Sequence, residues 1–208
     1  TAVGFNAGVS VSTGIQNTIV GGLAGDAMTT GDTNTFVGYQ AGMDADASNT
    51  SPISCTYIGS RSGENIDDGT GGNTAVGYAA LFGATSNANT AANNVAVGLD
   101  SLFAITSGAS NVAIGASSAN TISEGEFNVA IGYQSLSGAT TQADGNTAVG
   151  YQSMDGDWTT AAHANSVAIG RGTMRGVLTA ASSGSVAVGL SALAALTAGT
   201  GNTAVGFE

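Results

Sequence analysis

One short pattern of apolar and polar residues recurs from one end of the chain to the other. A Thr or Val, a variable residue and a Val or Ile are followed by a glycine, and most copies open with an Asn. β-Branched side chains at alternate positions are typical of a β-strand, and no 3.6-residue period runs through these segments. Each copy therefore predicts a short strand that ends at its glycine.

The glycines of this motif set the period of the repeat. Their successive spacings are 17, 17, 21, 18, 21, 17, 17, 18, 20, 19 and 17 residues. The motif glycines are Gly4, Gly21, Gly38, Gly59, Gly77, Gly98, Gly115, Gly132, Gly150, Gly170, Gly189 and Gly206. One strand in each short period is typical of a solenoid, and the Leu pattern of leucine-rich repeats is absent. We therefore predict one all-β domain over residues 1–208, a parallel β-solenoid (β-roll) of about 12 coils of 17–21 residues.

Coils are numbered here by their motif glycines, so that coil one contains Gly4 and coil twelve Gly206. Each coil is predicted to hold a strand, a bend at the glycine, a second short extended piece and a polar loop. Stacked strands add about 4.8 Å per coil, which makes a rod roughly 50 Å long. The chain begins and ends inside the motif, as expected of a segment of a longer fibre.

A polar column precedes the strands. The residue four positions before the glycine is Asn17, Asn34, Asn73, Asn94, Asn111, Asn128, Asn146 or Asn202, with Cys55, Ser166 and Ser185 as exceptions. Stacked amides can bond along the axis as a ladder. The alternative is that Asn only starts each strand as a turn residue.

In two other columns, large side chains at one position accompany small residues at the other. Two residues before the glycine, most copies have Ala, but coils two to four have Ile19, Phe36 and Tyr57. Four residues after the glycine, the same coils have Gly, whereas most later coils have Leu or Met. Such an exchange is expected when both positions fill one space, which we take to be the coil interior. The Thr/Val, Val/Ile and Tyr/Leu/Phe positions then point outward, and so long an apolar stripe indicates a partner chain.

The repeats resemble two families of surface fibres. Asn165–Gly170 and Asn111–Gly115 are similar to head repeats of YadA-type trimeric autotransporter adhesins, while Asn146–Ser153 and Asn34–Gly42 are similar to repeats of phage tail-fibre proteins. The resemblance implies a homotrimeric β-solenoid outside the cell, on a virion tail or a bacterial surface. The coils here are longer than those of the adhesin heads, and the choice between the two families stays open.

Composition and charge narrow the partners. The chain has a net charge of −11 and only three cationic residues, so we expect neither nucleic acid nor an anionic membrane surface as a partner. No apolar run reaches the roughly 18 residues of a membrane span, so no membrane insertion is expected from this segment. Mean hydropathy is +0.20, which disfavours disorder.

Few residues are candidates for catalysis or metal binding. His163 is the only histidine and is predicted to be a solvated loop residue, and Cys55 is predicted to be a small thiol packed in the Asn column. Loop carboxylates, such as those of Asp44, Asp46, Asp155 and Asp157, are predicted to be solvated; weak Ca²⁺ binding and glycoside hydrolysis are the alternatives. We expect no other cofactor.

Insertions in the longer coils are the candidate recognition loops. They lie at 43–54, 82–93 and 155–165, and they carry Asp44, Asp46, Asp155, Trp158 and His163. We expect a non-enzymatic, structural and adhesive fibre segment whose loops bind a receptor or cell-surface glycan. The alternatives are an ice- or surface-binding solenoid, which needs a flat face of Thr or Asn, and a polysaccharide-degrading tailspike.

Overall fold

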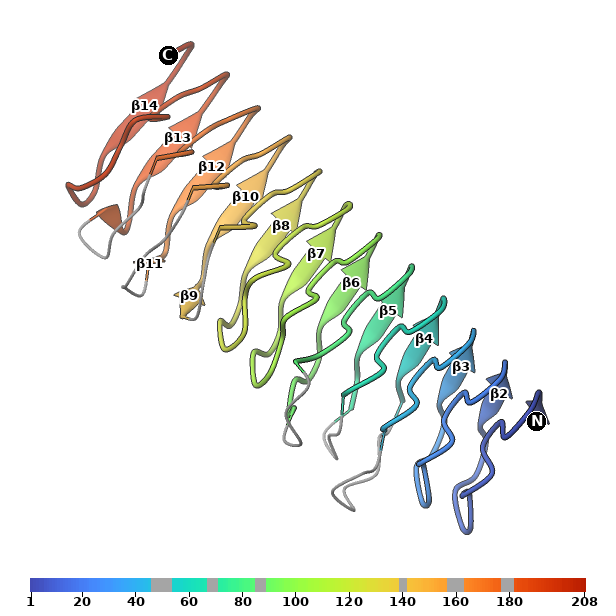
Figure 1. Cartoon of the computed structure of the whole chain (residues 1–208). Helices are drawn as coiled ribbons and strands as arrows, with labels where there is room; N and C mark the ends of the chain where they lie inside the picture. The colour runs from blue at the N-terminus through green and yellow to red at the C-terminus, as the bar shows by residue number, and fades with distance from the viewer. Residues whose placement is uncertain (46–53, 67–70, 85–88, 139–141, 157–162, 177–181) are drawn as a thin grey trace.

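The computed structural model describes residues 1–45, 54–66, 71–84, 89–138, 142–156, 163–176 and 182–208. Its main element is a twelve-stranded parallel sheet in which each motif copy supplies one strand, in chain order (Figure 1). These strands are β1 (Ala2–Val3), β2 (Thr18–Val20), β3 (Thr35–Val37), β4 (Thr56–Ile58), β5 (Thr74–Val76), β6 (Val95–Val97), β7 (Val112–Ile114), β8 (Val129–Ile131), β10 (Thr147–Val149), β12 (Val167–Ile169), β13 (Val186–Val188) and β14 (Thr203–Val205). The prediction of an all-β parallel solenoid is confirmed.

The strands keep one register despite unequal coil lengths. Val97 pairs with Ile114 across a 17-residue period, and Val37 pairs with Ile58 across a 21-residue period. The extra residues are therefore accommodated outside the sheet. A second, two-stranded sheet, β9 (Ala143–Asp144) with β11 (His163–Ala164), lies at the edge of the coils that carries the loops (Figure 1).

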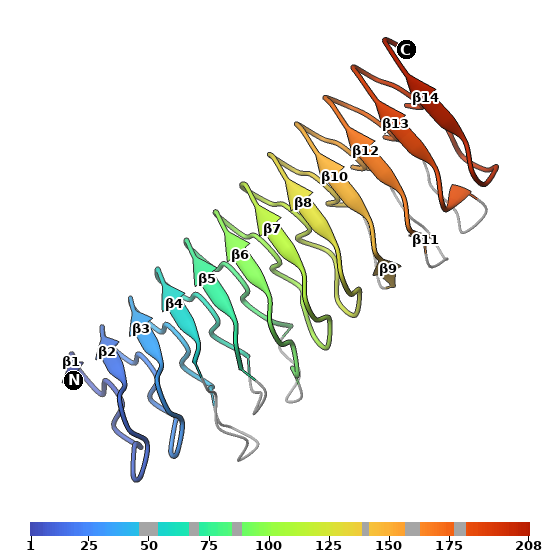
Figure 2. The same cartoon turned by 180° about the vertical axis from the view of Figure 1, so that it is seen from behind.

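Each coil is narrow and has two walls. The strands form one wall, and the chain then bends sharply at a tip and returns as a zigzag along the opposite wall (Figures 1 and 2). The loops gather along the edge opposite the tips, and the two termini lie at opposite ends of the rod. Within the described residues no helix is long and apolar enough to cross a membrane.

Glycine is required at the bend for two reasons. The backbone φ at Gly98 is +132°, a value that residues with a side chain rarely adopt. A methyl group on Gly98 would also lie 2.7 Å from the carbonyl carbon and oxygen of Gly115 on the next coil. The zigzag that follows contains further positive φ values, at 56° for Gln40 and 57° for Gly42 in coil three. The tight return path therefore depends on left-handed backbone positions two and four residues after the bend.

The interior contains the two exchanged columns. In the main sheet, the central residue of each strand from β2 to β13 is buried: Ile19, Phe36, Tyr57, Ala75, Ala96, Ala113, Ala130, Ala148, Ala168 and Ala187. Leu81, Leu102, Leu136, Met154 and Met174 face them from the return wall and are also fully buried. The Phe36 and Tyr57 rings stack with centroids 5.1 Å apart and planes at 6°. A methyl group on Gly63 would lie 2.4 Å from the Tyr57 ring, so the glycine leaves room for the aromatic ring.

A further interior column lies seven residues after the motif glycine. Met28, Ile66, Ile105 and Ile122 are buried there, and Val11 and Leu196 are packed at the same position near the two ends. This column closes the interior on the side of the loops. This column is not evident from the sequence, because it lies where the insertions of the longer coils interrupt the period.

The asparagine column forms hydrogen bonds from coil to coil. The Asn111 backbone N–H donates to Asn94 Oδ1 at 2.9 Å, and the Asn111 Nδ2 amide donates to the Gly125 carbonyl at 2.8 Å. Asn94 and Asn111 are both buried, so the ladder satisfies polar groups that would otherwise be desolvated. Serine continues the ladder near the C-terminus, where the Ser185 N–H donates to Ser166 Oγ at 3.1 Å.

Candidate functional site

The outer side of the main sheet presents a row of exposed Val and Ile side chains along the rod. Because side chains alternate along a strand, the residues on either side of the buried central one point away from the interior. We define the outer sheet face by the Thr/Val and Val/Ile positions, three and one residues before each motif glycine. Ile114 and Ile131 are 39% and 37% exposed there, since neighbouring coils cover their sides and leave their ends open.

A second row of apolar side chains continues this face around the bend. It is formed by the residue directly after the motif glycine, at the tip of each coil, and we call it the tip ridge. Its exposed apolar members are Phe5, Tyr39, Tyr78, Leu99, Tyr133, Tyr151, Leu190 and Phe207. The outer sheet face and the tip ridge together follow the whole length of the rod.

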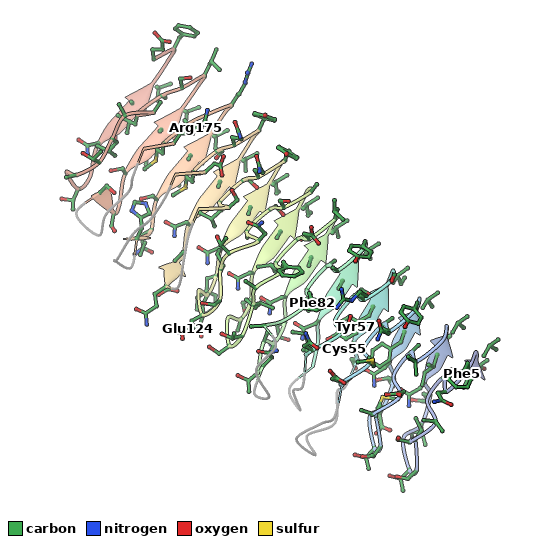
Figure 3. All side chains as sticks on the ribbon, viewed as in Figure 1. Phe5, Cys55, Tyr57, Phe82, Glu124 and Arg175 are labelled. Carbon is green, nitrogen blue, oxygen red and sulfur yellow. The ribbon has the colours of Figure 1, made fainter. Side chains whose placement is uncertain are left out.

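The charge distribution sets this surface apart from the rest of the chain. None of the 14 acidic residues occupies a position of the outer sheet face or the tip ridge, although the net charge of the chain is −11. The one charged residue at these positions is Arg171, whose guanidinium lies 5.6 Å from the centroid of the Tyr151 ring. Carboxylates lie elsewhere, and Figure 3 shows Glu124 at the loop edge, away from the tips. The surface is thus both apolar and free of negative charge.

A charged cluster lies on the return wall. Arg61 Nε donates to Glu64 Oε2 at 2.5 Å, and the guanidinium lies 4.7 Å from the centroid of the Phe82 ring. The Phe82 and Phe103 rings stack at 4.8 Å, which extends the cluster over three coils. Hydrogen bonds from Arg61 to Glu64, and to a smaller degree Tyr78, raise the pKa of Arg61 above its ordinary value. Glu64 is therefore paired with Arg61, and the cluster lies over the return wall of coils four to six.

This cluster was not predicted from the sequence. Two signals for it were present. Arg61 and Glu64 are three residues apart, and Phe82 and Phe103 occupy the same position, five residues after the motif glycine, in successive coils. In-register stacking makes a shared position in neighbouring coils equivalent to a contact.

The structure corrects the prediction for His163. The residue was expected to be a solvated loop histidine, but it is fully buried in β11, beside Ala143 of β9. Its Nδ1 lies 3.1 Å from Ser182 Oγ on the following coil. Neighbouring coils have Ala143 and Ser182 at this position, so register places His163 inside the stack. It is not available on a recognition loop.

The other predicted recognition residues are not brought together. Asp44 in coil three and Asp155 in coil nine are both half-buried, and the Ser137 hydroxyl donates to the Asp155 carboxylate. Asp46 and Trp158 lie outside the described residues, as do the centres of the three insertions. The recognition-loop hypothesis therefore stays a prediction.

Metal and thiol chemistry has little support in the described part of the chain. No three His, Cys, Asp or Glu side chains come together there as a metal site. Weak Ca²⁺ binding by loop carboxylates stays a prediction. Cys55 is a buried free thiol whose backbone N–H donates to Asn34 Oδ1 at 2.9 Å, in place of an asparagine of the ladder.

Comparison of the chain with models of known protein families, with curated proteins and with solved structures gave no match. The resemblance to adhesin heads and tail-fibre repeats thus stays a prediction based on the repeat motif. The outer sheet face and the tip ridge form the candidate functional site.

Proposed function

We propose that this chain is the rod segment of an extracellular surface fibre, on a phage tail or a bacterial cell, and that its outer sheet face packs against further copies of the chain. The observation that carries the proposal is the continuous apolar face without a carboxylate. Its structural role is to space and present other parts of the fibre. Receptor or glycan binding by the loops is a part of the proposal that rests on the repeat resemblance.

The size of the face supports self-association. From the Thr/Val position to the tip residue, four residues further along the chain, the outer sheet face and the tip ridge together cover on the order of 650 Å² over a rod of about 50 Å. A typical monomer exposes at most about 300–600 Å² of contiguous apolar surface, and a standard interface buries about 800 Å² per partner. The outer sheet face and the tip ridge together therefore approach one side of a standard protein interface in size.

Charge also favours a second copy as the occupant. Two chains that each carry a net charge of −11 repel one another through most of their surfaces. On the outer sheet face this repulsion is weakest, because the nearest carboxylates lie in other columns. A symmetric oligomer uses the same surface of every subunit, and a homotrimer is the form that we propose.

The test is the native mass of the full chain, measured by light scattering over a range of concentrations. Ile114→Glu places a carboxylate in the centre of the outer sheet face and is expected to lower the mass to that of a monomer, at 20.0 kDa. Ser107→Glu is the matched control, because Ser107 is exposed in the loop region and the variant adds the same charge. A monomeric parent chain would overturn the proposed assembly.

A second candidate function has one specific observation in its favour. Thr18, Thr35, Thr56 and Thr74 pair in register on four consecutive strands and project from the outer sheet face. A regular Thr array about 4.8 Å apart suits a repeating surface such as ice. Val occupies the position in the next three strands, β6, β7 and β8, which weakens the array. Thermal hysteresis of the monomeric Ile114→Glu variant and of the parent chain tests this candidate.

A further inference from the structure

Two tyrosines of the tip ridge lie face to face on neighbouring coils. The ring centroids of Tyr133 and Tyr151 are 5.4 Å apart, and the ring planes are inclined by 17°. The residues are 47% and 46% exposed. In the single chain, both phenol rings are therefore held against each other and remain accessible to a reagent in solution.

The backbone keeps this pair in register. The Gln152 N–H donates to the Tyr133 carbonyl at 2.9 Å, and the strands that lead into the two tips pair Ile131 with Val149. Beside the rings, Gln152 Nε2 donates to Gln134 Oε1 at 3.0 Å. Hydrogen bonds on both sides of the tip thus fix the position from which each ring projects.

Among the described residues, Tyr133 and Tyr151 stack on each other and on no further ring. On the far side of Tyr151, the next coil places the Arg171 guanidinium 5.6 Å from the ring centroid. On the far side of Tyr133, the preceding coil has Ala116 at the tip position, and its carbonyl accepts the Gln134 N–H. Each of the two rings has the other as its one tyrosine neighbour along the ridge.

The remaining tyrosines form an internal comparison. Tyr39 and Tyr78 are also exposed on the tip ridge, but the coil between them has Ser60 at this position. They are two coils apart, or about 10 Å. The fifth tyrosine, Tyr57, is fully buried in the interior and stacks on Phe36.

We propose that Tyr133 and Tyr151 form an oxidative cross-linking site, at which a haem peroxidase and hydrogen peroxide join the two rings as dityrosine. Each phenol loses one electron and its hydroxyl proton and becomes a phenoxyl radical. The two radicals form one carbon–carbon bond between ring carbons ortho to the oxygens, and each displaced ring hydrogen moves to the oxygen of its own ring. The two electrons and two protons that were removed reduce one hydrogen peroxide to two waters.

The bond would connect coil eight covalently to coil nine. It would close a loop across the tip ridge and restrict the unfolded chain, as a disulfide does. We therefore expect the cross-linked chain to have a higher melting temperature than the untreated chain. This inference concerns a single chain and does not depend on the proposed assembly.

The experiment treats the dilute full chain with a haem peroxidase and hydrogen peroxide. The expected product is a single chain whose mass is lower by two hydrogen atoms and which shows dityrosine fluorescence. Cleavage before aspartates should then release residues 100–143 and 144–154 as one joined species. Running the same reaction on Ile114→Glu keeps the result independent of self-association.

Tyr133→Phe and Tyr151→Phe are each expected to abolish the cross-link while they keep a stacked ring and the folded state, checked by circular dichroism. The double variant Tyr39→Phe with Tyr78→Phe is expected to retain it in full. The proposal is overturned if the cross-link persists in Tyr133→Phe, if only chain-to-chain products form, or if the folded parent chain consumes peroxide without forming the joined fragment.

Discussion

In coils two to four the strand supplies the bulk of the interior, whereas in most later coils the return wall supplies it. Tyr57 projects from β4 toward Gly63, and in coil eight Leu136 projects from the return wall toward Ala130 of β8. The two arrangements coexist in one continuous sheet with unbroken register. In these coils a large side chain from either wall can fill the interior, whereas coil seven has only Ala113 and Ala119 there, both buried.

The same comparison shows at which positions a glycine can be replaced by a residue with a side chain. Gly63 and Leu136 occupy the same position and have similar φ values of 58° and 54°. The backbone there accepts a side chain, and the opposing ring decides whether one fits. At the bend, by contrast, Gly59 and Gly132 have φ values of 132° and 129°, and both contact the backbone of the next coil. Glycine is therefore required at the bend in the early coils and in the later ones.

The largest expected effect comes from filling both walls of one coil. Gly63→Leu places a side chain where the Tyr57 ring already lies, and we expect a loss of more than about 4 kcal/mol in the free energy of unfolding. The double variant Tyr57→Ala with Gly63→Leu converts coil four to the later arrangement and should recover most of that loss. Denaturant unfolding of both single variants and the double variant measures the coupling. If the losses of the two single variants simply add in the double variant, the two positions do not share one space.

A slightly smaller effect is expected from emptying the return wall of a later coil. Leu136→Ala leaves Ala130 without an opposing side chain, and we expect a loss of about 2–4 kcal/mol in the free energy of unfolding. Leu136→Met is the control, because Met154 and Met174 fill the equivalent positions of two later coils. It should cost less than about 1.5 kcal/mol in the same unfolding measurement.

The ladder allows a third comparison, between its asparagine and serine sections. Asn111→Ala removes the acceptor for the Asn128 N–H and the donor to the Gly125 carbonyl. We expect it to lower the free energy of unfolding by about 1–3 kcal/mol. Asn111→Ser should cost less, because Ser166 and Ser185 accept the equivalent bond near the C-terminus. Hydrogen exchange of the Asn128 amide distinguishes the two variants. Equal protection in the Ala variant and the parent chain would argue against the ladder.

The smallest effect is expected on the return wall of coil four. Glu64→Gln removes the charge beside Arg61, whose side chain is 38% exposed, and should cost at most about 1 kcal/mol. Since the pKa of Arg61 is raised in the folded chain, its contribution is complete below the ordinary arginine pKa and disappears only as the pH rises through the raised value. The cost should therefore not change between mildly acidic and mildly alkaline pH, as thermal melts at several pH values can show. A strong pH dependence there would require another titrating group.

The prediction from sequence was strongest where residues repeat in register. The motif predicted every strand of the main sheet, because β-branched alternation and the bend glycine act locally. The exchange between Phe36 and Gly42 predicted the interior, because stacked coils bring the same position together. The prediction for His163 was wrong, since insertions near residues 155–165 hide its position relative to the neighbouring Ala143 and Ser182.

By itself, the sequence determined the parallel solenoid, its strand register, the glycine bends and the carboxylate-free outer columns. These properties follow from side-chain identity at a fixed distance from each glycine. Only the tertiary structure decided the burial of His163, the interior column of Met28, Ile66, Ile105 and Ile122, and the contact of the Arg61 guanidinium with the Phe82 ring. Their physical reason is the return path, whose left-handed positions turn the chain back over the sheet and bring together residues that local pattern does not relate.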